Sequence, residues 1–177
     1  TGRIGLDLLP SSPALAGAEV ELVDLPGREM RLRRALEEIR QRYDFTLIDT
    51  PPSLGMLTVN ALTAADGVLI PIQCEYLPLE GLSQLLHTVE LVRQNLNPDL
   101  IIRGLVMTMY DSRTSLSRQV VEEVRQHFQN MLFQAIIPRS IKLSEAPGYG
   151  EPIISYAPDS GGAQAYAALC EELLTTE

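Results

Sequence analysis

Residues 67–109 read GVLIPIQCEYLPLEGLSQLLHTVELVRQNLNPDLIIRGLVMTM, and this stretch decides the fold class. Two continuous apolar runs, Gly67–Ile72 and Leu100–Met109, lie on either side of a segment with leucines and valines at helical spacing. That segment, Leu79–Asn95, stops before Asn97-Pro98, a helix-terminating pair. Continuous apolar runs are typical of parallel strands that are buried on both faces. The stretch therefore predicts a strand, a crossover helix and a second, parallel strand.

Similar apolar runs occur on both sides of this unit. Phe45–Asp49 (FTLID) and Leu132–Pro138 (LFQAIIP) are predicted strands, and Arg3–Pro10 (RIGLDLLP) is a candidate for a further one. Strands that alternate with helical segments indicate βαβ units and a parallel sheet. In such sheets ligands bind beyond the carboxyl ends of the strands, so the residues that directly follow each run are the first candidates for a site.

Helical periodicity fills the remaining segments. Helices are predicted over Arg28–Arg42, over Leu116–Phe128 with Ser115 or Thr114 as its cap, and over Ala163–Leu174. The arginines of the first of these are interleaved with glutamates, a pattern that favours a solvated face over a nucleic-acid surface. We predict an α/β fold, a mostly parallel sheet with helices on both faces, formed by one domain over residues 1–177.

Composition excludes several classes of protein. The 177 residues are 45% hydrophobic, which is enough for a buried core and argues against disorder. No apolar run approaches the roughly 20 residues that span a bilayer. Cys74 and Cys170 form no CxxC pair, so a structural zinc site is not expected. The net charge of -9 argues against broad coating by nucleic acid, although a local basic patch is still possible.

Lys142 is the single lysine of the chain, and it lies in SIKLSEAP with no glycine before it. A phosphate-binding P-loop is a glycine-rich turn that ends in lysine. The sequence therefore excludes a P-loop from these residues.

The segment FTLIDTPPSLG, residues 45–55, is the first that could carry chemistry. Asp49 follows four apolar residues and would lie at the tip of a strand, where a carboxylate can hold Mg²⁺ through water. The pattern alone is weak, because aspartate at such a position more often caps a helix. Thr50, Pro51 and Pro52 fix an extended turn directly after it.

Four blocks of sequence resemble the ParA/Soj family of chromosome and plasmid partitioning ATPases, which are close to the MinD-like deviant Walker ATPases. The blocks cover residues 45–62, 65–85, 104–128 and 137–153, in the same order and spacing as in that family. QCEYLPLEGLSQL and KLSEAP resemble the partitioning branch in particular. The resemblance extends over essentially the whole chain and implies a P-loop NTPase type of fold.

The resemblance also implies roles for individual residues. Asp49 would be the Walker B carboxylate that acts on Mg²⁺ through water, and Thr50 and Pro51 would belong to the switch-like turn beside the nucleotide. Thr108, Pro138 and Arg139 would lie against the adenine of ATP. For two of them a structural role is equally consistent with the sequence: Thr108 as a buried strand hydroxyl, and Pro138 as a strand terminator.

The family's phosphate-binding lysine and its catalytic residues belong to an N-terminal segment that has no counterpart here. The resemblance therefore implies no catalytic residue within this chain. Binding of ATP and Mg²⁺ belongs to the intact family protein, and the chain alone is expected not to hydrolyse ATP.

By the same resemblance, Arg113, Arg139 and Lys142 would contact DNA phosphates, with Arg118 a weaker candidate. The alternative for each is a solvated surface charge. Because the net charge is -9, one copy should bind DNA poorly, and two copies side by side would double the local basic patch. DNA binding and dimerisation are thus expected to be coupled.

The function implied is an ATP-dependent homodimer that binds DNA without sequence preference, is regulated by a ParB-type partner, and is cytoplasmic and nucleoid-associated. A non-catalytic module without a P-loop, which binds a partner or DNA, is the alternative. A MinD-like membrane-positioning ATPase is less favoured, because the chain ends in the acidic CEELLTTE and no membrane contact is expected.

Overall fold

The computed structural model describes residues 1–75 and 78–175. The chain divides into two compact units, Thr1–Ala65 with Thr88–Asp99, and Asp66–His87 with Leu100–Glu177. Helix α4, Pro78–Asn95, belongs to both, because its first half lies in the second unit and its second half in the first. The single-domain organisation expected from the sequence stays a prediction.

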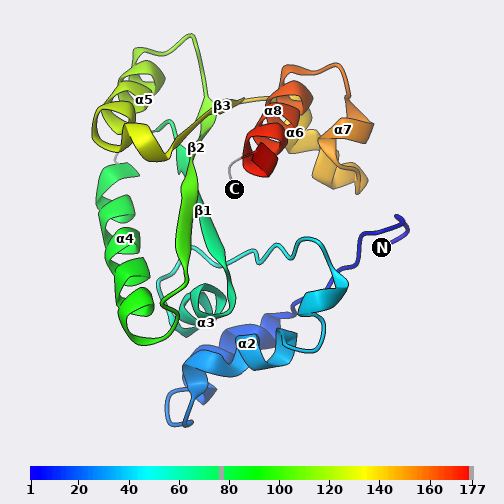
Figure 1. The fold of residues 1–177 in the computed structure, drawn as a ribbon. Helices are drawn as coiled ribbons and strands as arrows, with labels where there is room; N and C mark the ends of the chain where they lie inside the picture. Colours follow the sequence, from blue (N-terminus) through cyan, green and yellow to red (C-terminus); the bar gives the residue numbers. More distant parts are fainter. Residues whose placement is uncertain (76–77, 176–177) are drawn as a thin grey trace. The chain divides into compact units, whose positions relative to one another are not determined.

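The second unit is built on a parallel sheet of three strands among the described residues (Figure 1). The strands are β1 (Gly67–Gln73), β2 (Ile101–Tyr110) and β3 (Leu132–Pro138), in the order β1-β2-β3. Both pairings are parallel. The three strands predicted over these residues are confirmed, and so is the α/β fold class.

Helices cover both faces of this sheet (Figure 1). On one face, Leu105 and Met107 of β2 are fully buried and pack with residues of α4 and α5 (Ser115–Phe128). On the other face, Val106 packs with Leu169 of α8 (Gly161–Thr175). Successive side chains of a strand point to opposite faces, which is why a strand covered on both sides has a continuous apolar sequence.

The three helices α4, α5 and α8 confirm the sequence predictions over these ranges. Thr114 is the N-cap of α5, since its hydroxyl accepts the backbone N–H of Ser117 at 3.3 Å. Short helices complete this unit: η4 (Gln129–Met131), α6 (Ile141–Glu145), η5 (Ala146–Tyr149) and α7 (Ile153–Tyr156).

The first unit is helical in its described residues. Its elements, besides the end of α4, are η1 (Pro13–Gly17), α1 (Ala18–Glu21), η2 (Arg28–Met30), α2 (Arg31–Leu36), η3 (Arg40–Arg42) and α3 (Met56–Ala64). Asn60 of α3 connects two of them, because its amide donates to the carbonyl of Arg28 at 2.9 Å and its oxygen accepts the N–H of Leu32 at 3.1 Å. Asn97, also buried, donates to the carbonyl oxygens of Leu62 and Ala65.

One continuous helix over Arg28–Arg42 was predicted, and the structure corrects its extent. The segment forms η2, α2 and η3, with turns between α2 and η3. Short helices are stable only where they pack. The described packing is at the start of the segment, where Asn60 binds the backbone at Arg28 and Leu32.

Two predicted strands, Phe45–Asp49 and Arg3–Pro10, are wrong. Neither segment is a strand in the structure, and Phe45 and Leu47 are 71% and 95% exposed. A strand needs a hydrogen-bonded neighbour, and in the described residues the only strands are the three of the second unit. Asp49 thus follows an irregular segment instead of a strand.

Helix α3 was not predicted from the sequence. It is buried at polar positions, with Thr58 and Thr63 donating hydroxyl hydrogen bonds to the carbonyls of Ser53 and Val59 at 2.6 and 2.7 Å. Polar residues on its inner side weaken the apolar periodicity from which a helix is recognised.

Candidate functional site

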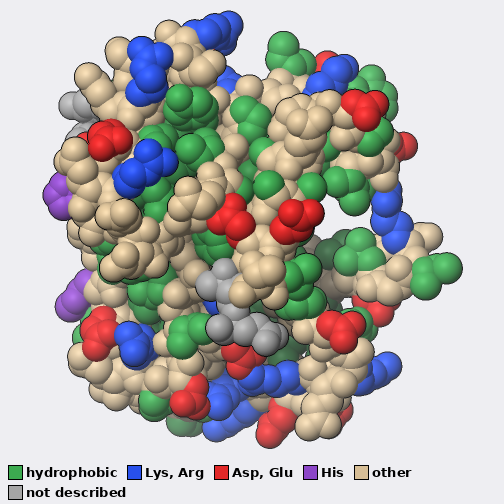
Figure 2. Space-filling view, turned by 45° about the horizontal axis from the view of Figure 1, so that its top comes forward, with side chains coloured by type: hydrophobic (Ala, Val, Ile, Leu, Met, Phe, Trp, Pro, Cys, Tyr) green, Lys and Arg blue, Asp and Glu red, His purple; other side chains and the backbone are tan. Residues whose placement is uncertain are grey.

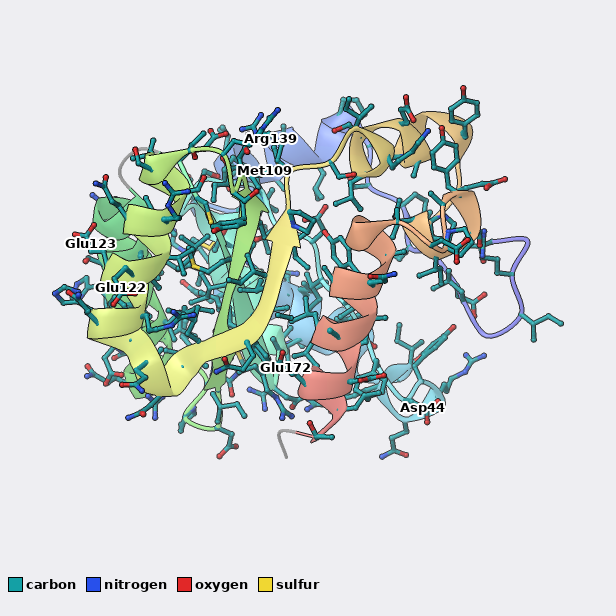
Figure 3. The ribbon with its side chains drawn as sticks, turned by 90° about the horizontal axis from the view of Figure 1, so that it is seen from above. Asp44, Met109, Glu122, Glu123, Arg139 and Glu172 are labelled. Atoms are coloured by element: carbon teal, nitrogen blue, oxygen red, sulfur yellow. The ribbon has the colours of Figure 1, made fainter. Side chains whose placement is uncertain are left out.

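The segments that follow the three strands are tied together by backbone hydrogen bonds. After β1, the N–H of Cys74 donates to the carbonyl of Thr108 at 2.8 Å, and after β3 the N–H of Arg139 donates to the carbonyl of Tyr110 at 2.8 Å. In Figure 3, Met109 and Arg139 are labelled close together at the ends of β2 and β3. Three sequence-distant segments therefore meet at the carboxyl edge of the sheet, where ligands bind in open α/β folds.

Met109 marks this edge with an unusual backbone conformation. Its φ is 55°, and it is the single non-glycine residue with positive φ among those described. The register between β2 and β3 shifts between Met107 and Tyr110 in the same place. A left-handed non-glycine residue costs about 1–3 kcal/mol, and such residues cluster at functional sites. Met109 is the second-last residue of β2, just before the loop that carries Asp111 and Arg113.

Thr108 and Pro138, two predicted nucleotide-binding residues, lie half-buried at this edge. The Thr108 hydroxyl donates to the carbonyl of Ile72 at 3.2 Å. It therefore has the structural hydrogen bond that was its alternative role, while its hydroxyl oxygen can still accept a second one. Pro138 is the last residue of β3.

Arg113 is held by a carboxylate two residues earlier. Asp111 accepts the Arg113 backbone N–H at 3.0 Å and its Nε–H at 2.9 Å on one oxygen, and a terminal guanidinium N–H at 2.7 Å on the other. The Arg113 side chain is 84% exposed and that of Asp111 only 17%. The Arg113 side-chain hydrogen bonds lower the pKa of Asp111 to about 2. Asp111 is consequently ionised throughout the physiological pH range.

Arg139, predicted to serve both adenine and DNA, forms an ion pair with Glu75 of the segment after β1. Both side chains are about half-exposed. Arg118, five residues after Arg113, donates from its guanidinium to the carbonyl of Ser112 at 2.7 Å. This contact ties the weaker DNA candidate, at the start of α5, to the loop that carries Arg113.

Lys142, the third predicted DNA contact, lies on α6 and pairs with Glu145 at 3.0 Å. The Tyr156 hydroxyl donates to the same carboxylate at 2.9 Å, and the Lys142 ammonium lies 5.5 Å from the Tyr156 ring centroid. Exposed Tyr149 stacks on Tyr156 with ring centroids 5.2 Å apart. Lys142 lowers the pKa of Glu145, with Tyr156 adding to the effect, so this carboxylate is also ionised at neutral pH.

The predicted metal and switch residues lie in the first unit. Asp49, Thr50, Pro51 and Pro52 are exposed and have irregular backbone before α3. The structure therefore does not bring them into one described unit with Thr108, Pro138 and Arg139.

Glu19 of α1 closes the N-terminus of α3 directly after this segment. Its carboxylate accepts the N–H of Met56 at 2.9 Å and of Leu57 at 3.2 Å. A Cβ at Gly55 would lie 2.5 Å from the Glu19 oxygens, so only glycine fits there without displacing them. A carboxylate at this position satisfies free N–H groups and complements the helix dipole. It thereby fixes where the 49–55 segment ends.

A cation site made wholly of side chains is absent from the described part of the chain, because it contains no group of three or more His, Cys, Asp or Glu residues suited to a metal. Asp49 supplies one exposed carboxylate. Magnesium keeps several waters and is commonly held by one or two carboxylates together with substrate phosphates. Asp49 fits that role as one ligand, whereas the phosphate cradle has no counterpart in these residues.

The sequence interpretation missed the three carboxylates that hold the basic side chains. Lys142 and Glu145 are three residues apart on α6, a spacing that favours pairing on a helix, whereas the two-residue spacing of Asp111 and Arg113 gives no such signal. Glu75 and Arg139 are 64 residues apart, and no local pattern signals their contact.

A membrane-spanning segment is likewise not found, because no helix of the described residues is both long and apolar enough.

The parallel sheet, covered by helices on both faces, defines an α/β protein, and its similarity to the solved structures reported below makes the fold that of the P-loop NTPase type. Residues 2–102 match the family model of an AAA domain. The chain is 56% identical over 168 residues to the sporulation initiation inhibitor protein Soj of Bacillus subtilis, covering 95% of this chain and 66% of Soj. It is also 56% identical over 169 residues to the chromosome partitioning protein ParA of Myxococcus xanthus, covering 96% of this chain and 60% of that protein. The chain belongs to the ParA/Soj family of partitioning ATPases.

Solved structures agree with the fold. A cobyrinic acid a,c-diamide synthase from Mycobacterium smegmatis with bound ADP and magnesium has a TM-score of 0.78 at 40% identity, over 94% of this chain and 60% of that one. A plasmid partition protein from Borrelia burgdorferi has a TM-score of 0.73 at 21% identity, over 96% of this chain and 62% of that one, which supports the fold alone. The chain spans about 60–66% of the length of the first curated relatives that it matches.

Proposed function

We propose that the chain is the part of a chromosome or plasmid partitioning ATPase that follows the phosphate-binding loop. The intact protein would dimerise with ATP, bind DNA of any sequence on the nucleoid, and be regulated by a ParB-type partner. The observation that carries this proposal is the 56% identity to Soj over 95% of the chain. Binding energy from ATP and DNA would shift the protein between free and DNA-bound populations.

Nucleotide and Mg²⁺ would be bound by the residues that the family resemblance implies. Asp49 would hold the ion through water, beside the turn of Thr50 and Pro51, and Thr108, Pro138 and Arg139 would line the adenine. The M. smegmatis protein with bound ADP and magnesium supports nucleotide binding by this fold. When bound, Mg²⁺ would neutralise the charge that develops on the phosphates.

An ATPase assay tests the nucleotide part of the proposal. The complete gene product that contains this chain should hydrolyse ATP, and Asp49→Ala should reduce turnover by at least about tenfold because it removes a metal ligand. Asp44→Ala is the matched control, since Asp44 is also exposed and lies five residues earlier in the same irregular region (Figure 3). Undiminished turnover in Asp49→Ala would refute the metal role.

The 177-residue chain tested alone should show no turnover, because its single lysine, Lys142, is not in a glycine-rich loop. The lack of a P-loop in these residues favours a second candidate function, a non-catalytic module that binds the ParB-type partner or DNA. Turnover by the chain alone that Asp49→Ala abolishes would eliminate this candidate.

The DNA interface would consist of Arg113, Arg139 and Lys142. Their exposure supports the proposal, and so does the hydrogen bond that joins the Arg139 and Tyr110 backbones. Alanine at each position should weaken binding to a random-sequence duplex by about three- to tenfold and flatten its salt dependence. Arg125→Ala in the last turn of α5 is the matched control, since Arg125 also lies beside a carboxylate, Glu122, but is not one of the proposed DNA contacts. Equal loss in all four variants would point to net charge and against this interface.

Dimerisation should accompany ATP binding, and light scattering with and without ATP measures it. A protein that binds DNA equally well as a monomer without nucleotide would contradict the proposed coupling.

A further inference from the structure

All three basic side chains of the proposed DNA interface are already paired with carboxylates. Asp111 holds Arg113, Glu75 holds Arg139, and Glu145 holds Lys142. We call Asp111, Glu75 and Glu145 the inhibitory carboxylates. Three positive charges against three negative ones leave these pairs with no net charge, in a chain whose overall charge is -9. The face in Figure 2 likewise carries basic and acidic side chains interspersed.

We propose that the inhibitory carboxylates regulate the interface: each competes with a DNA phosphate for its basic side chain and keeps DNA binding weak until the pair opens. This inference rests on the proposed DNA-binding function and adds its regulation. The ligand is the phosphate backbone of duplex DNA, because ion pairs with guanidinium and ammonium groups recognise charge and not base sequence.

The pairs are built to open at modest cost. Arg113 and Lys142 are 84% and 54% exposed, and Arg139 is 47% exposed. Ion pairs between exposed side chains add little stability, because water and salt screen them. A phosphate can therefore take the place of a carboxylate without unfolding the edge.

The Asp111–Arg113 and Glu145–Lys142 pairs do not open by protonation at neutral pH. Arg113 lowers the pKa of Asp111 to about 2, and Lys142 lowers that of Glu145. Asp111 and Glu145 are thus permanent negative charges beside their basic partners. Only an anionic competitor or a rearrangement of the loops separates the basic side chains from these carboxylates. The interface should therefore respond to the number of phosphates that are presented together.

The geometry also provides substitutions that remove the charge and keep the shape. The side-chain oxygen of Asp111→Asn can still accept the Arg113 backbone N–H, and that of Glu145→Gln can still accept the Tyr156 hydroxyl. Glu75→Gln completes the set. Glu123→Gln on α5 is the matched control, because Glu123 is exposed and has no ion pair among the described residues (Figure 3).

The experiment measures binding of a random-sequence DNA duplex to the complete gene product, with and without ATP and Mg²⁺, over a series of salt concentrations. Each inhibitory-carboxylate variant should bind about three- to tenfold more tightly at moderate salt, and the plot of log affinity against log salt should steepen by up to about 0.9 per variant. Glu123→Gln should change affinity less than about twofold and leave the slope unaltered, because it lies away from the contacts. Thermal unfolding of each variant checks that the fold is intact.

The outcomes separate this inference from the function on which it rests. If wild type binds DNA, Arg113→Ala weakens binding and the amide variants match Glu123→Gln or bind more weakly, the interface stands and the inhibition is refuted. If wild type binds poorly and a variant that combines Asp111→Asn, Glu75→Gln and Glu145→Gln binds well, inhibition is supported. If neither binds in any nucleotide state, both proposals are refuted.

Discussion

The Glu172 carboxylate on α8 accepts the backbone N–H of Ala135 on β3 at 2.7 Å, and its other oxygen accepts the N–H of Gln134 at the same distance. β3 is an edge strand of the sheet in the described residues, and its register with β2 shifts between Leu132 and Ile136, so Gln134 and Ala135 lie in the irregular stretch. Unpaired N–H groups at an edge are costly when buried and invite pairing with another chain. One side chain thus takes the place of a neighbouring strand and fastens α8 to the sheet (Figure 3).

We expect Glu172→Ala to lower the free energy of unfolding by about 1–3 kcal/mol, because it removes charge-assisted hydrogen bonds and leaves the N–H of buried Ala135 without its acceptor. Glu171→Ala, the exposed neighbour on the same helix, should change it by less than about 0.5 kcal/mol. Urea denaturation of both variants makes the comparison. Equal losses would assign the effect to the helix and not to the contact with β3.

Gly104 of β2 lies directly against the ring of Phe133, which leaves no room for a larger side chain. Its φ is 154°, and a Cβ there would lie 2.3 Å from Phe133 Cε2 and 2.9 Å from the carbonyl oxygen of Met131. We expect Gly104→Ala to destabilise the protein by about 1–3 kcal/mol, since the aromatic ring must move. Gly148→Ala has nothing within 4 Å of the added carbon and should have an effect within about 0.5 kcal/mol. Thermal melts distinguish the two, and a neutral Gly104→Ala would contradict the tight packing.

The strands and long helices of the second unit could be predicted from the sequence because their cause is local. β2 shows a continuous apolar run since Leu105 and Val106 are buried on opposite faces. The same rule failed at Phe45–Asp49, where an equally apolar run lies exposed without a paired strand. An apolar run indicates that a segment can be buried. Whether it forms a β-strand also depends on a neighbouring strand, which the pattern of apolar residues does not reveal.

At the candidate site, the positions of Arg113, Arg139 and Lys142 at the ends of strands were predictable, and their pairing was not. Glu75 reaches Arg139 only because β1 and β3 end at the same edge. The left-handed backbone of Met109 had no signal either, since methionine does not favour positive φ. Contacts between residues distant in sequence and strained conformations are properties of the folded sheet, which a sequence pattern does not contain.

Acid should weaken the contribution of Asp111. Arg113 lowers its pKa from about 4 in the unfolded chain to about 2 in the fold, so the unfolded state binds more protons between these values. Its stabilising effect is fully present above about pH 4 and declines as the pH falls towards 2. The difference in unfolding free energy between wild type and Asp111→Asn should therefore shrink over that range. Asp159→Asn, at an exposed position, serves as the control, and a difference independent of pH would contradict the pairing.

The two cysteines should react very differently with alkylating reagents. Thiolates are the reactive form, and burial raises the pKa of the Cys74 thiol to about 11, whereas Cys170 is exposed on α8. Cys74 is only 1% exposed, and its backbone is held on both sides, with its N–H donating to Thr108 and its carbonyl accepting the Ser117 hydroxyl.

Iodoacetamide at pH 8 followed by peptide mass spectrometry should label Cys170 quickly and Cys74 only after denaturant is added. Labelling of Cys74 in the native protein at a rate similar to that of Cys170 would mean that the edge of the sheet opens without unfolding. Because Cys74 lies one residue before Glu75, a change in its labelling on adding DNA would also report directly whether that edge moves when the Glu75–Arg139 pair is displaced.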